Sequence, residues 1–435
     1  MKSEILQRAK GVRDFGPKEK IARNKIVQTL QQVFESFGFN PIETPIIERS
    51  DLFASKFGIG EESDAMKETF KLKDQGLRDL VLRTEFTVPF ARFVGMNPQF
   101  KKPFKRYQIG QVYRDGPIKL GRYREFWQCD VDVVGEPDLF LDAEILQLVS
   151  EAFVKLGIAV EVQINNRKIL NAILNYAGIA DADQVSVIIS IDKLDKVGRK
   201  GVQVELENKG IAKENVATVL ELITLKGNNK ELLEKLETKI GDNEGISEVR
   251  QVLENVLDGS NINFVPSLAR GLAYYTGNVF EVYLEDKTKF SSSVCGGGRY
   301  DSMIGGFLED GKVYPSVGIS FGLETIFDAL SLSENKEMQA SVVDVYIVPM
   351  KDDFIKPALK IAKTLRALDV NTDISYVNKK FKKGMEYANT YKIPWVIILG
   401  EDEIKSEKVM LRNMKTGDQK LFDVKEVAEE ILKFK

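Results

Sequence analysis

Three arginines flank the loop between two apolar, β-rich segments of the chain. The segments FKRYQIGQVYR and REFWQCDVDVVG lie within residues 104–135 and are joined by DGPIKLGRY, which contains glycine and proline. This pattern predicts a long antiparallel hairpin with Arg114 on one strand and Arg122 and Arg124 on the other. Because guanidinium groups offer fixed pairs of N–H donors to phosphate oxygens, the hairpin predicts a triphosphate site. A solvated basic hairpin that binds no ligand is the alternative.

Two shorter segments combine arginine, tyrosine and glycine. The segment LARGLAYYTG carries Arg270 followed by Tyr274 and Tyr275, and CGGGRYD carries Arg299 and Tyr300 after three glycines. Glycines allow a backbone to approach a ligand closely. The tyrosines either line a site beside these glycines or fill the hydrophobic core, which is the more common place for an aromatic side chain.

Three carboxylates lie in otherwise apolar runs. Glu85, in LRTEFTVPF, is either a solvent-facing strand residue or a ligand for a cation. Asp130 and Asp132, in QCDVDVV, are two residues apart and face the same side of a strand. Because buried, unpaired carboxylates are costly, we expect this pair to have a cationic partner.

The composition removes several kinds of chemistry. None of the 435 residues is histidine, so no imidazole can act as a general base, activate a nucleophile or bind a metal ion. The two cysteines, Cys129 and Cys295, are too far apart in the sequence to indicate a zinc cluster. Neither a P-loop nor a strand-borne GxGxxG motif occurs. The chemistry must therefore depend on arginine, lysine, carboxylates, tyrosine, backbone dipoles or a bound ion.

Hydrophobic periodicity indicates the elements that must position these residues. Residues 19–38 and about 138–156 are predicted to be amphipathic helices, and PIETPIIE (41–48) is predicted to be a strand interrupted by proline. AVEVQIN and NVFEVYL (278–284) read as further strands. GISFGLETIFDAL is expected to form a helix after a Gly-punctuated stretch.

The composition and the hydrophobic pattern of the sequence change along the chain, and these changes predict the domain organisation. The predicted parts are a core in two pieces (1–165 and 259–330), a helical insertion rich in Lys and Glu (166–258), a polar linker (331–340) and a C-terminal α/β domain with a mainly parallel sheet (341–435). The net charge of the chain is −3. The C-terminal domain is mildly basic, which is weak evidence for a polyanionic partner. The chain lacks both a membrane-spanning stretch and a signal-peptide core, so we expect a cytoplasmic protein.

These segments resemble those of a known family. GFNPIETPIIE, the hairpin and GISFGLETIF are similar to the first, second and third motifs of class II aminoacyl-tRNA synthetases. LARGLAYYTG and CGGGRYD resemble two signatures peculiar to the histidine–tRNA ligases, and the match to these enzymes runs essentially end to end. LRTEFTVPFARFVGMN and GRYREFWQCDVDVVG are most similar to the eukaryotic-type variants of the same segments.

The resemblance implies an α+β fold: a six-stranded antiparallel catalytic sheet flanked by helices, a helical insertion and a C-terminal anticodon-binding domain. It implies a homodimer, with Pro45 in the dimer-forming element. The implied reaction converts L-histidine and ATP, with Mg²⁺, into histidyl-adenylate and pyrophosphate, and then passes the histidyl group to the 3′ end of tRNA(His).

The resemblance also implies a role for each matching residue. Glu85 and Thr87 would hold the α-amino group of histidine, while Gln128, Asp132 and Tyr275 would shape the pocket and read the imidazole. Tyr274 and Tyr300 complete the expected histidine-binding set. Arg114 would bind the α-phosphate of ATP and Arg122 the outer phosphates, and Arg270 would neutralise the charge that develops at the α-phosphate.

Three positions depart from the family pattern. Thr325 follows Glu324 at the position where the family has an arginine that stacks over adenine. Ala273 stands where the family has an aspartate. Gly116 stands where the family has an acidic residue, although Asp115 is adjacent to it. The alternative function is therefore a non-charging, histidine-binding paralogue that regulates a histidine-pathway enzyme. Retention of Arg114, Arg122 and Arg270, the C-terminal domain and the basic run KKFKK (379–383) favours the ligase.

Overall fold

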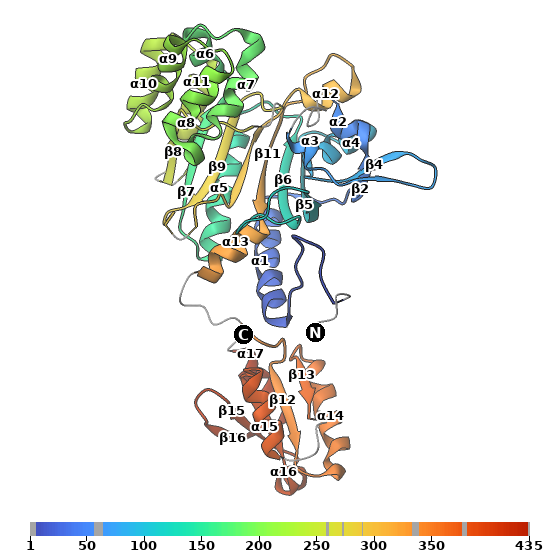
Figure 1. Ribbon diagram of the computed structural model, residues 1–435. Coiled ribbons are helices and arrows are strands. Elements are labelled where there is room, and N and C mark those ends of the chain that lie inside the picture. The colour runs from blue at the N-terminus through green and yellow to red at the C-terminus, as the bar shows by residue number, and fades with distance from the viewer. Residues whose placement is uncertain are drawn as a thin grey trace. The chain divides into compact units, whose positions relative to one another are not determined.

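A computed structural model gives the fold of the chain. It describes residues 6–55, 64–257, 261–271, 274–288, 290–332, 339–375 and 381–433. The contacts divide the chain into two compact units, one of residues 1–13 and 26–334 and one of residues 14–25 and 335–435. Each unit is described by itself (Figure 1).

The larger unit is built on an eight-stranded sheet, in the order β1-β5-β6-β11-β10-β9-β7-β8. Every neighbouring pair from β5 to β7 in this order is antiparallel, and only the short edge strands β1 and β8 pair in parallel. The predicted six-stranded antiparallel sheet is thus confirmed, with one parallel strand added at each edge. The strands are β1 (Asn40–Pro41), β5 (Phe104–Tyr113), β6 (Glu125–Val134), β7 (Val160–Asn166), β8 (Ile262–Phe264), β9 (Asn278–Leu284), β10 (Cys295–Arg299) and β11 (Ser316–Gly322).

The predicted hairpin forms the β5–β6 pair. Its strands pair without interruption from Phe104 opposite Val134 to Tyr113 opposite Glu125. The loop between them closes with a bridge between Lys119 and Arg122. The arginines of the hairpin therefore lie at its loop end, as predicted.

The core of the larger unit lies between the sheet and the helices that cover it. Phe321 of β11 contacts Phe34 and Phe153, with ring centroids 5.4 and 5.7 Å apart. These two phenylalanines lie on α1 and α5, the helices predicted at 19–38 and 138–156. The helices of the core are α1 (Pro17–Ser36), α2 (Ser50–Ala54), α3 (Asp64–Lys67), α4 (Thr87–Met96), α5 (Phe140–Leu156), α12 (Met303–Leu308) and α13 (Leu323–Leu332).

Two sequence predictions fail in this unit. Residues 41–48 do not form one strand, because β1 ends at Pro41 and pairs with β5, whereas β2 (Ile47–Arg49) joins a separate small sheet with β3 (Lys71–Lys73) and β4 (Asp79–Leu82). The segment GISFGLETIFDAL is not all helix, because residues up to Gly322 form β11 between β6 and β10. The residues of β11 alternate Val317, Ile319 and Phe321 with serine and glycine, but the strand is followed directly by α13 at Leu323, so the sequence pattern did not separate the two elements.

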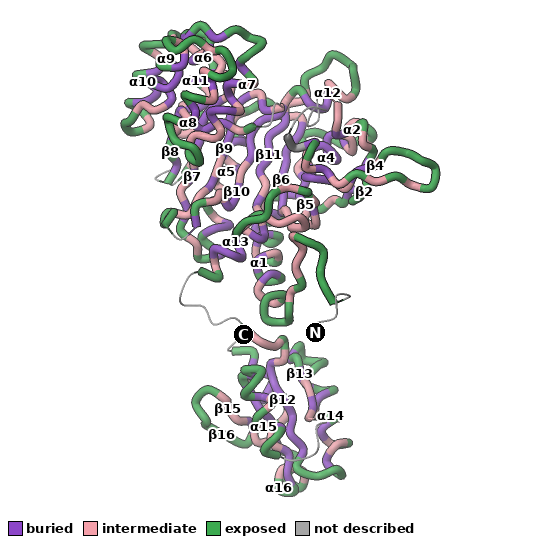
Figure 2. The backbone as a smooth tube through the Cα atoms, viewed as in Figure 1, coloured by how far each residue is buried: buried purple, intermediate pink, exposed green. Residues whose placement is uncertain are grey.

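The helical insertion follows β7 and returns to the sheet at β8. Its six helices form one group beside the β7–β8 edge of the sheet, coloured green to yellow in Figure 1. Figure 2 shows that their inward faces are buried while their outer faces are exposed, as expected for amphipathic helices. They are α6 (Arg167–Tyr176), α7 (Asp181–Ile191), α8 (Leu194–Asn208), α9 (Lys213–Ile223), α10 (Asn229–Ile240) and α11 (Glu244–Asn255).

The smaller unit contains a five-stranded sheet in the order β13-β12-β14-β15-β16. The first three strands are parallel and alternate with helices, as predicted, but β15 and β16 form an antiparallel hairpin that the sequence analysis did not predict. The elements are β12 (Val345–Pro349), a 3₁₀ turn (Asp352–Phe354), α14 (Ile355–Arg366), β13 (Thr372–Ile374), α15 (Phe381–Thr390), β14 (Trp395–Leu399), α16 (Glu401–Ser406), β15 (Val409–Asn413), β16 (Gln419–Phe422) and α17 (Val424–Leu432).

Among the described residues, no helix is both long enough and apolar enough to cross a membrane.

Candidate active site

One large cavity, of about 880 Å³, opens over the sheet of the larger unit. Its lining includes residues from the β5–β6 hairpin, from the glycine-rich strand β10 and from β11. All ten residues that the resemblance assigned to histidine or ATP line it: Glu85, Thr87, Arg114, Arg122, Gln128, Asp132, Arg270, Tyr274, Tyr275 and Tyr300. The fold therefore brings together residues that are almost 220 positions apart in the sequence.

Glycines on β10 and β11 provide the room for this cavity. A Cβ atom at Gly296 would lie 2.0 Å from Nη1 of Arg270, and one at Gly318 would lie 1.9 Å from Oδ1 of Asp132. Two of the functional side chains thus occupy space that any larger residue at these positions would take. The CGGGRYD segment is therefore needed for glycines that leave space for other side chains, as much as for the charged side chains that it carries.

Glu85 lies between β4 and α4, and its carboxylate faces the first turn of the helix. Its oxygens accept hydrogen bonds from the backbone N–H groups of Thr87 (2.5 Å) and Val88 (2.8 Å). Burial raises the pKa of Glu85, and these two N–H groups oppose that rise. The carboxylate is buried, so the alternative of a solvent-facing strand residue is wrong.

Asp132 forms the centre of a buried polar cluster. Its Oδ2 lies 2.5 Å from Nη2 of Arg106, and its Oδ1 accepts a hydrogen bond of 2.5 Å from the hydroxyl of Tyr300. Burial raises the pKa of Asp132 to about 6, although Arg106 and the Tyr300 hydroxyl stabilise the carboxylate. The cationic partner expected for the aspartate pair is therefore Arg106, which is fully buried on β5.

Three tyrosines form the wall beside this cluster. The rings of Tyr274 and Tyr275 lie 4.8 Å apart, and Tyr274 meets Tyr300 edge to face at 6.2 Å. Burial raises the pKa of each phenol, so all three are neutral hydrogen-bonding groups near pH 7. Gln128 of β6 also lines the cavity, and its Oε1 is buried without a hydrogen-bond partner.

The arginines occupy another part of the lining. Nε of Arg114 donates to the carbonyl oxygen of Thr84 (3.0 Å), which holds the guanidinium group against the cavity wall. Arg122 lies near Lys119, and its charge lowers the pKa of that lysine together with partial burial. Arg124 does not line the cavity and instead forms an ion pair of 2.8 Å with Asp115. Two of the three hairpin arginines thus face the cavity.

Arg270 lies in the loop after β8, under the glycines of β10. Its Nη1 donates to the carbonyl oxygen of Phe280 (3.3 Å) and lies 3.9 Å from a carboxylate oxygen of Glu281. Its Nε is buried without a hydrogen-bond partner. The guanidinium group therefore has donors left for a ligand.

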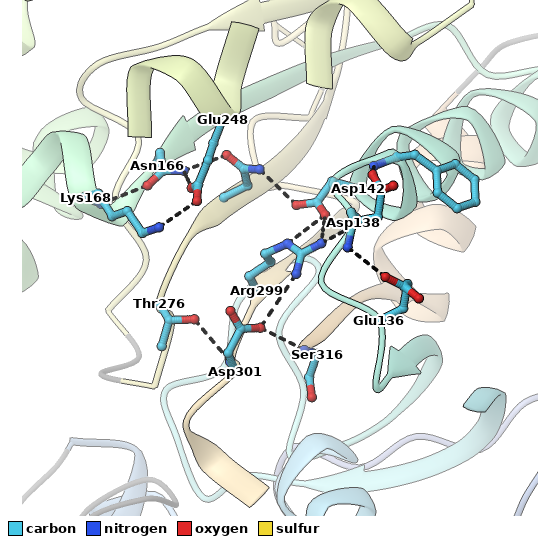
Figure 3. A network of polar contacts seen from close by, with 12 residues as sticks. Glu136, Asp138, Asp142, Asn166, Lys168, Glu248, Thr276, Arg299, Asp301 and Ser316 are labelled. Atoms are coloured by element: carbon cyan, nitrogen blue, oxygen red, sulfur yellow. Dashed lines mark hydrogen bonds and ion pairs between the residues drawn. The ribbon is translucent and has the colours of Figure 1, made fainter. Parts of the chain in front are cut away.

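Arg299, the other arginine singled out in the sequence, belongs to a structural network away from the cavity (Figure 3). Its Nη2 lies 2.6 Å from the carboxylate of Asp142 on α5 and 3.0 Å from the carbonyl oxygen of Asp138. The same carboxylate accepts a hydrogen bond of 2.9 Å from Asn278, which is bonded to Asn166 at the start of the helical insertion. The network ties the sheet to α5 and to the insertion.

The helical insertion also contributes to the cavity, which sequence reasoning missed. Asp192, Asp195 and Lys196 line it, at the junction of α7 and α8. In the sequence these residues lie in a Lys- and Glu-rich stretch that is typical of solvated helices. No local pattern marks them, because their place depends on how the insertion packs on the sheet.

The three departures from the family pattern have different surroundings. Thr325 lines the cavity, and its hydroxyl donates to the carbonyl oxygen of Gly322 (2.8 Å). Next to Gly116 the space for a side chain is taken by Glu68, whose carboxylate atoms would lie 2.8–2.9 Å from a Cβ at that position. Ala273 is outside the described residues.

The chain is similar to known proteins along nearly its whole length. Residues 11–326 match the family described as Histidyl-tRNA synthetase, and residues 344–434 match the Anticodon binding domain. Histidine–tRNA ligase 1 of Bacillus thuringiensis subsp. konkukian is 42% identical over 428 residues, which cover 95% of this chain and 97% of the relative. Histidine–tRNA ligase of Phocaeicola vulgatus is 39% identical over 443 residues, with 95% and 96% covered.

A solved structure supports the same assignment. The crystal structure of histidyl-tRNA synthetase from Nostoc sp. PCC 7120 superposes with a TM-score of 0.85 at 30% identity, and the match covers 99% of each chain. Sequence and fold therefore agree over both units, and the chain belongs to the histidyl-tRNA synthetase family.

Proposed function

We propose that the cavity activates L-histidine with ATP and that the chain is a histidine–tRNA ligase, which transfers the activated histidine to tRNA(His). The observation that carries this proposal is a single cavity lined by acceptors at Glu85, Gln128 and Asp132 and by the guanidinium groups of Arg114 and Arg270. An amino acid that is both a cation and a ring N–H donor fits the acceptors. A nucleoside triphosphate fits the arginines.

In this proposal histidine binds with its α-ammonium group at Glu85 and Thr87, and Gln128 helps to shape the pocket around the ring. The Glu85 carboxylate is held in one orientation by the N–H groups at the start of α4, so little conformational freedom is lost when it binds the substrate. The imidazole lies towards Asp132 and Tyr275, with Tyr274 and Tyr300 beside it. None of these groups needs to be histidine, which agrees with a chain that contains none.

ATP binds with its α-phosphate at Arg114 and its outer phosphates at Arg122. The carboxylate of histidine attacks the α-phosphate, and negative charge develops there as pyrophosphate leaves. Arg270 neutralises this charge from a fixed position beneath the β10 glycines, where donors need no reorganisation during the reaction. The chemistry thus requires positioning and charge neutralisation, and no proton-transferring side chain.

Mg²⁺ fits this site as a companion of ATP. The described residues contain no cluster of three side chains that could hold a metal ion alone. Magnesium is commonly bound by one or two carboxylates together with phosphate oxygens and water. Glu281 and Asp192, which line the cavity and face Arg270, are the carboxylates suited to supply such ligands, and the ion would screen the charge of the phosphates.

The proposal includes a homodimer. The segment around Pro45 leads into β2, an edge strand of the small sheet. The side chains of Ile46 and Ile47 there are 38% and 50% exposed, which places apolar surface at an open strand edge. Edge strands with exposed apolar residues are usually covered by a partner.

The non-charging paralogue is the less suitable alternative. A protein that only senses histidine needs no arginines at a phosphate site, yet Arg114, Arg122 and Arg270 all line the cavity. The match of residues 344–434 to an anticodon-binding domain also supports tRNA charging.

The decisive experiment is ATP–pyrophosphate exchange with the purified protein. We expect exchange that depends strictly on histidine, and a loss of about 10²- to 10³-fold in Arg270→Ala, as is typical when one fixed donor to a developing anion is removed. Arg124→Ala is the control, because Arg124 is also an arginine near the cavity, on the hairpin that carries Arg114 and Arg122, but it pairs with Asp115 and does not line the cavity. Histidine binding without exchange would contradict the ligase and support the histidine sensor.

A further inference from the structure

Asp130 is a buried carboxyl group to which none of these roles is assigned. It lies on β6, its side chain is 3% exposed, and it lines the cavity. It shares one face of the strand with Gln128 and Asp132, because side chains two residues apart point the same way. Its Oδ1 is buried without a hydrogen-bond partner. A buried acceptor without a partner has lost its hydration and gained nothing in return, so its presence calls for an explanation.

The neighbours of Asp130 are already engaged with other groups. Arg106 forms its close ion pair with Asp132, at 2.5 Å. Gln108, directly opposite Asp130 on β5, hydrogen-bonds to the hydroxyl of Thr44 at 3.1 Å. Ser320, opposite on β11, interacts with the carboxyl group but leaves Oδ1 without a partner. No described side chain supplies a donor to Oδ1, so a group that enters the cavity can supply it.

The charges around Asp130 favour a ligand that brings N–H donors. Burial raises the pKa of Asp130 to about 8; Arg106 on β5 opposes this rise, whereas Asp132 on β6 and Glu85 before α4 add to it. The thiol of Cys295 on β10 is neutral, because burial raises its pKa, and it points to the opposite face of the sheet with Phe321 and Cys129. Without a ligand, Asp130 therefore holds a proton near pH 7. A donor from the ligand would stabilise the carboxylate and release that proton.

We propose that Asp130 accepts a hydrogen bond from the imidazole N–H of bound histidine and is a specificity-determining residue of this enzyme. It lies on β6 between Gln128 and Asp132, the two residues of this strand that are expected to surround the imidazole. Asp132, whose oxygens already bind Arg106 and Tyr300, then acts with it as a positioning residue. This inference rests on the proposed function.

The opposing explanation is that Asp130 only balances the buried charge of Arg106. Two amino acids separate the two explanations: L-histidine, and β-(thiazol-4-yl)alanine, which keeps a five-membered ring but has no ring N–H. The experiment measures ATP–pyrophosphate exchange of the full-length protein with each of them. The variants are Asp130→Asn and Asp130→Ser, which remove the ionisable acceptor and remain small and polar.

A hydrogen bond from the ring predicts a selective effect. In Asp130→Asn the KM for histidine should rise about 10- to 100-fold, the range expected for a hydrogen bond to a charged group, while the KM for thiazolylalanine changes less than about threefold. The KM for ATP should not change. An equal rise with both amino acids would mean that Asp130 only balances Arg106, and it would overturn the proposal. A wild-type enzyme that does not exchange with any amino acid would refute the proposed function instead.

A measurement on the wild-type protein decides the matter even if both variants fail to fold. Binding of each amino acid is followed by calorimetry at about pH 7.5 in two buffers of different ionisation enthalpy. The pKa of Asp130 falls when it accepts the ring N–H, so its proton passes either to the buffer or to the imidazole. Histidine should therefore release more protons than thiazolylalanine, or its ring should be protonated in the complex, which the ¹⁵N chemical shifts of labelled histidine report. Equal release together with a neutral bound imidazole would overturn the proposal.

Discussion

Gly296 and Gly297, two neighbouring glycines of β10, differ in the atoms that an added Cβ would contact. At Gly296 a Cβ would contact the end of the Arg270 side chain, which can move aside. At Gly297 it would lie 2.0 Å from the carbonyl oxygen of Gly318 and 2.6 Å from Cα of Ile319, which are backbone atoms of β11. One glycine therefore makes room for a functional side chain, and its neighbour makes room for the sheet.

This contrast predicts opposite effects of the same substitution. Gly296→Ala should leave the free energy of unfolding nearly unchanged but displace Arg270, and reduce histidine-dependent exchange about 10²-fold or more. Gly297→Ala should destabilise the fold by about 1–3 kcal/mol or more, as overpacking does in a close-packed interior. Urea unfolding and exchange assays on both variants test the pair. Normal exchange in Gly296→Ala would show that the position of Arg270 is not critical.

At the residue level, the types of side chain were predictable and their partners were not. The hairpin arginines and the aspartate pair could be singled out because their spacing places them on one loop or one strand face. That Asp192 of the insertion faces Arg270 depends on contacts between distant segments. The capping of α4 by Glu85 is local, since the N–H donors are those of Thr87 and Val88, but the sequence analysis did not predict it. The residues of the signatures were assigned through the family resemblance, and local physics alone left the tyrosines undecided.

At the level of elements, the buried pair of Arg299 and Asp142 joins β10 to α5. The carboxylate of Asp142 is fully buried and accepts two bonds from Arg299, and the guanidinium group is 4% exposed. Removing one partner would leave the other charge buried and unpaired, and the free energy of that defect far exceeds the value of a surface pair. The arginine of the CGGGRYD segment, Arg299, thus serves the fold and not the reaction.

Asp142→Ala should therefore lower the free energy of unfolding by about 3–5 kcal/mol. The control is Glu151→Ala on the same helix, which removes an exposed i,i+4 pair with Lys155 and should cost only about 0–1 kcal/mol. Denaturant unfolding of the two variants compares them directly. Similar losses in both would mean that the buried pair contributes no more than a surface pair.

Elements with strong local signals were predicted well, and those that depend on sheet topology were not. The hairpin, the two long helices and the helices of the insertion follow from periodicity and turn residues. The strand β11 was predicted as part of the helix because α13 begins at the next residue with no turn between them. The split of residues 41–48 between two sheets follows from which strand each half pairs with. Pairing partners are long-range information that a single segment does not carry.

At the scale of the whole molecule, the cavity lies entirely within the larger unit, yet that unit leaves apolar surface uncovered. Every residue that lines the cavity belongs to residues 26–334. The β2 edge, with Ile46 and Ile47 exposed, is not part of the cavity lining. This edge therefore needs an explanation other than substrate binding, and the proposed homodimer would provide it.

If the homodimer forms through the β2 edge, a charge placed on that edge should prevent dimerisation. Ile47→Asp places a charge on the open edge of β2, and removing that charge from water in an apolar interface is costly. The variant should therefore be monomeric by light scattering, at concentrations where the wild-type protein has the mass of two chains. Val154→Asp is the control, since Val154 is 73% exposed on α5, away from this edge, and its substitution should leave the dimer intact. A wild-type protein with the mass of one chain would remove the homodimer. A dimeric Ile47→Asp variant would leave the dimer standing but would move its interface away from β2.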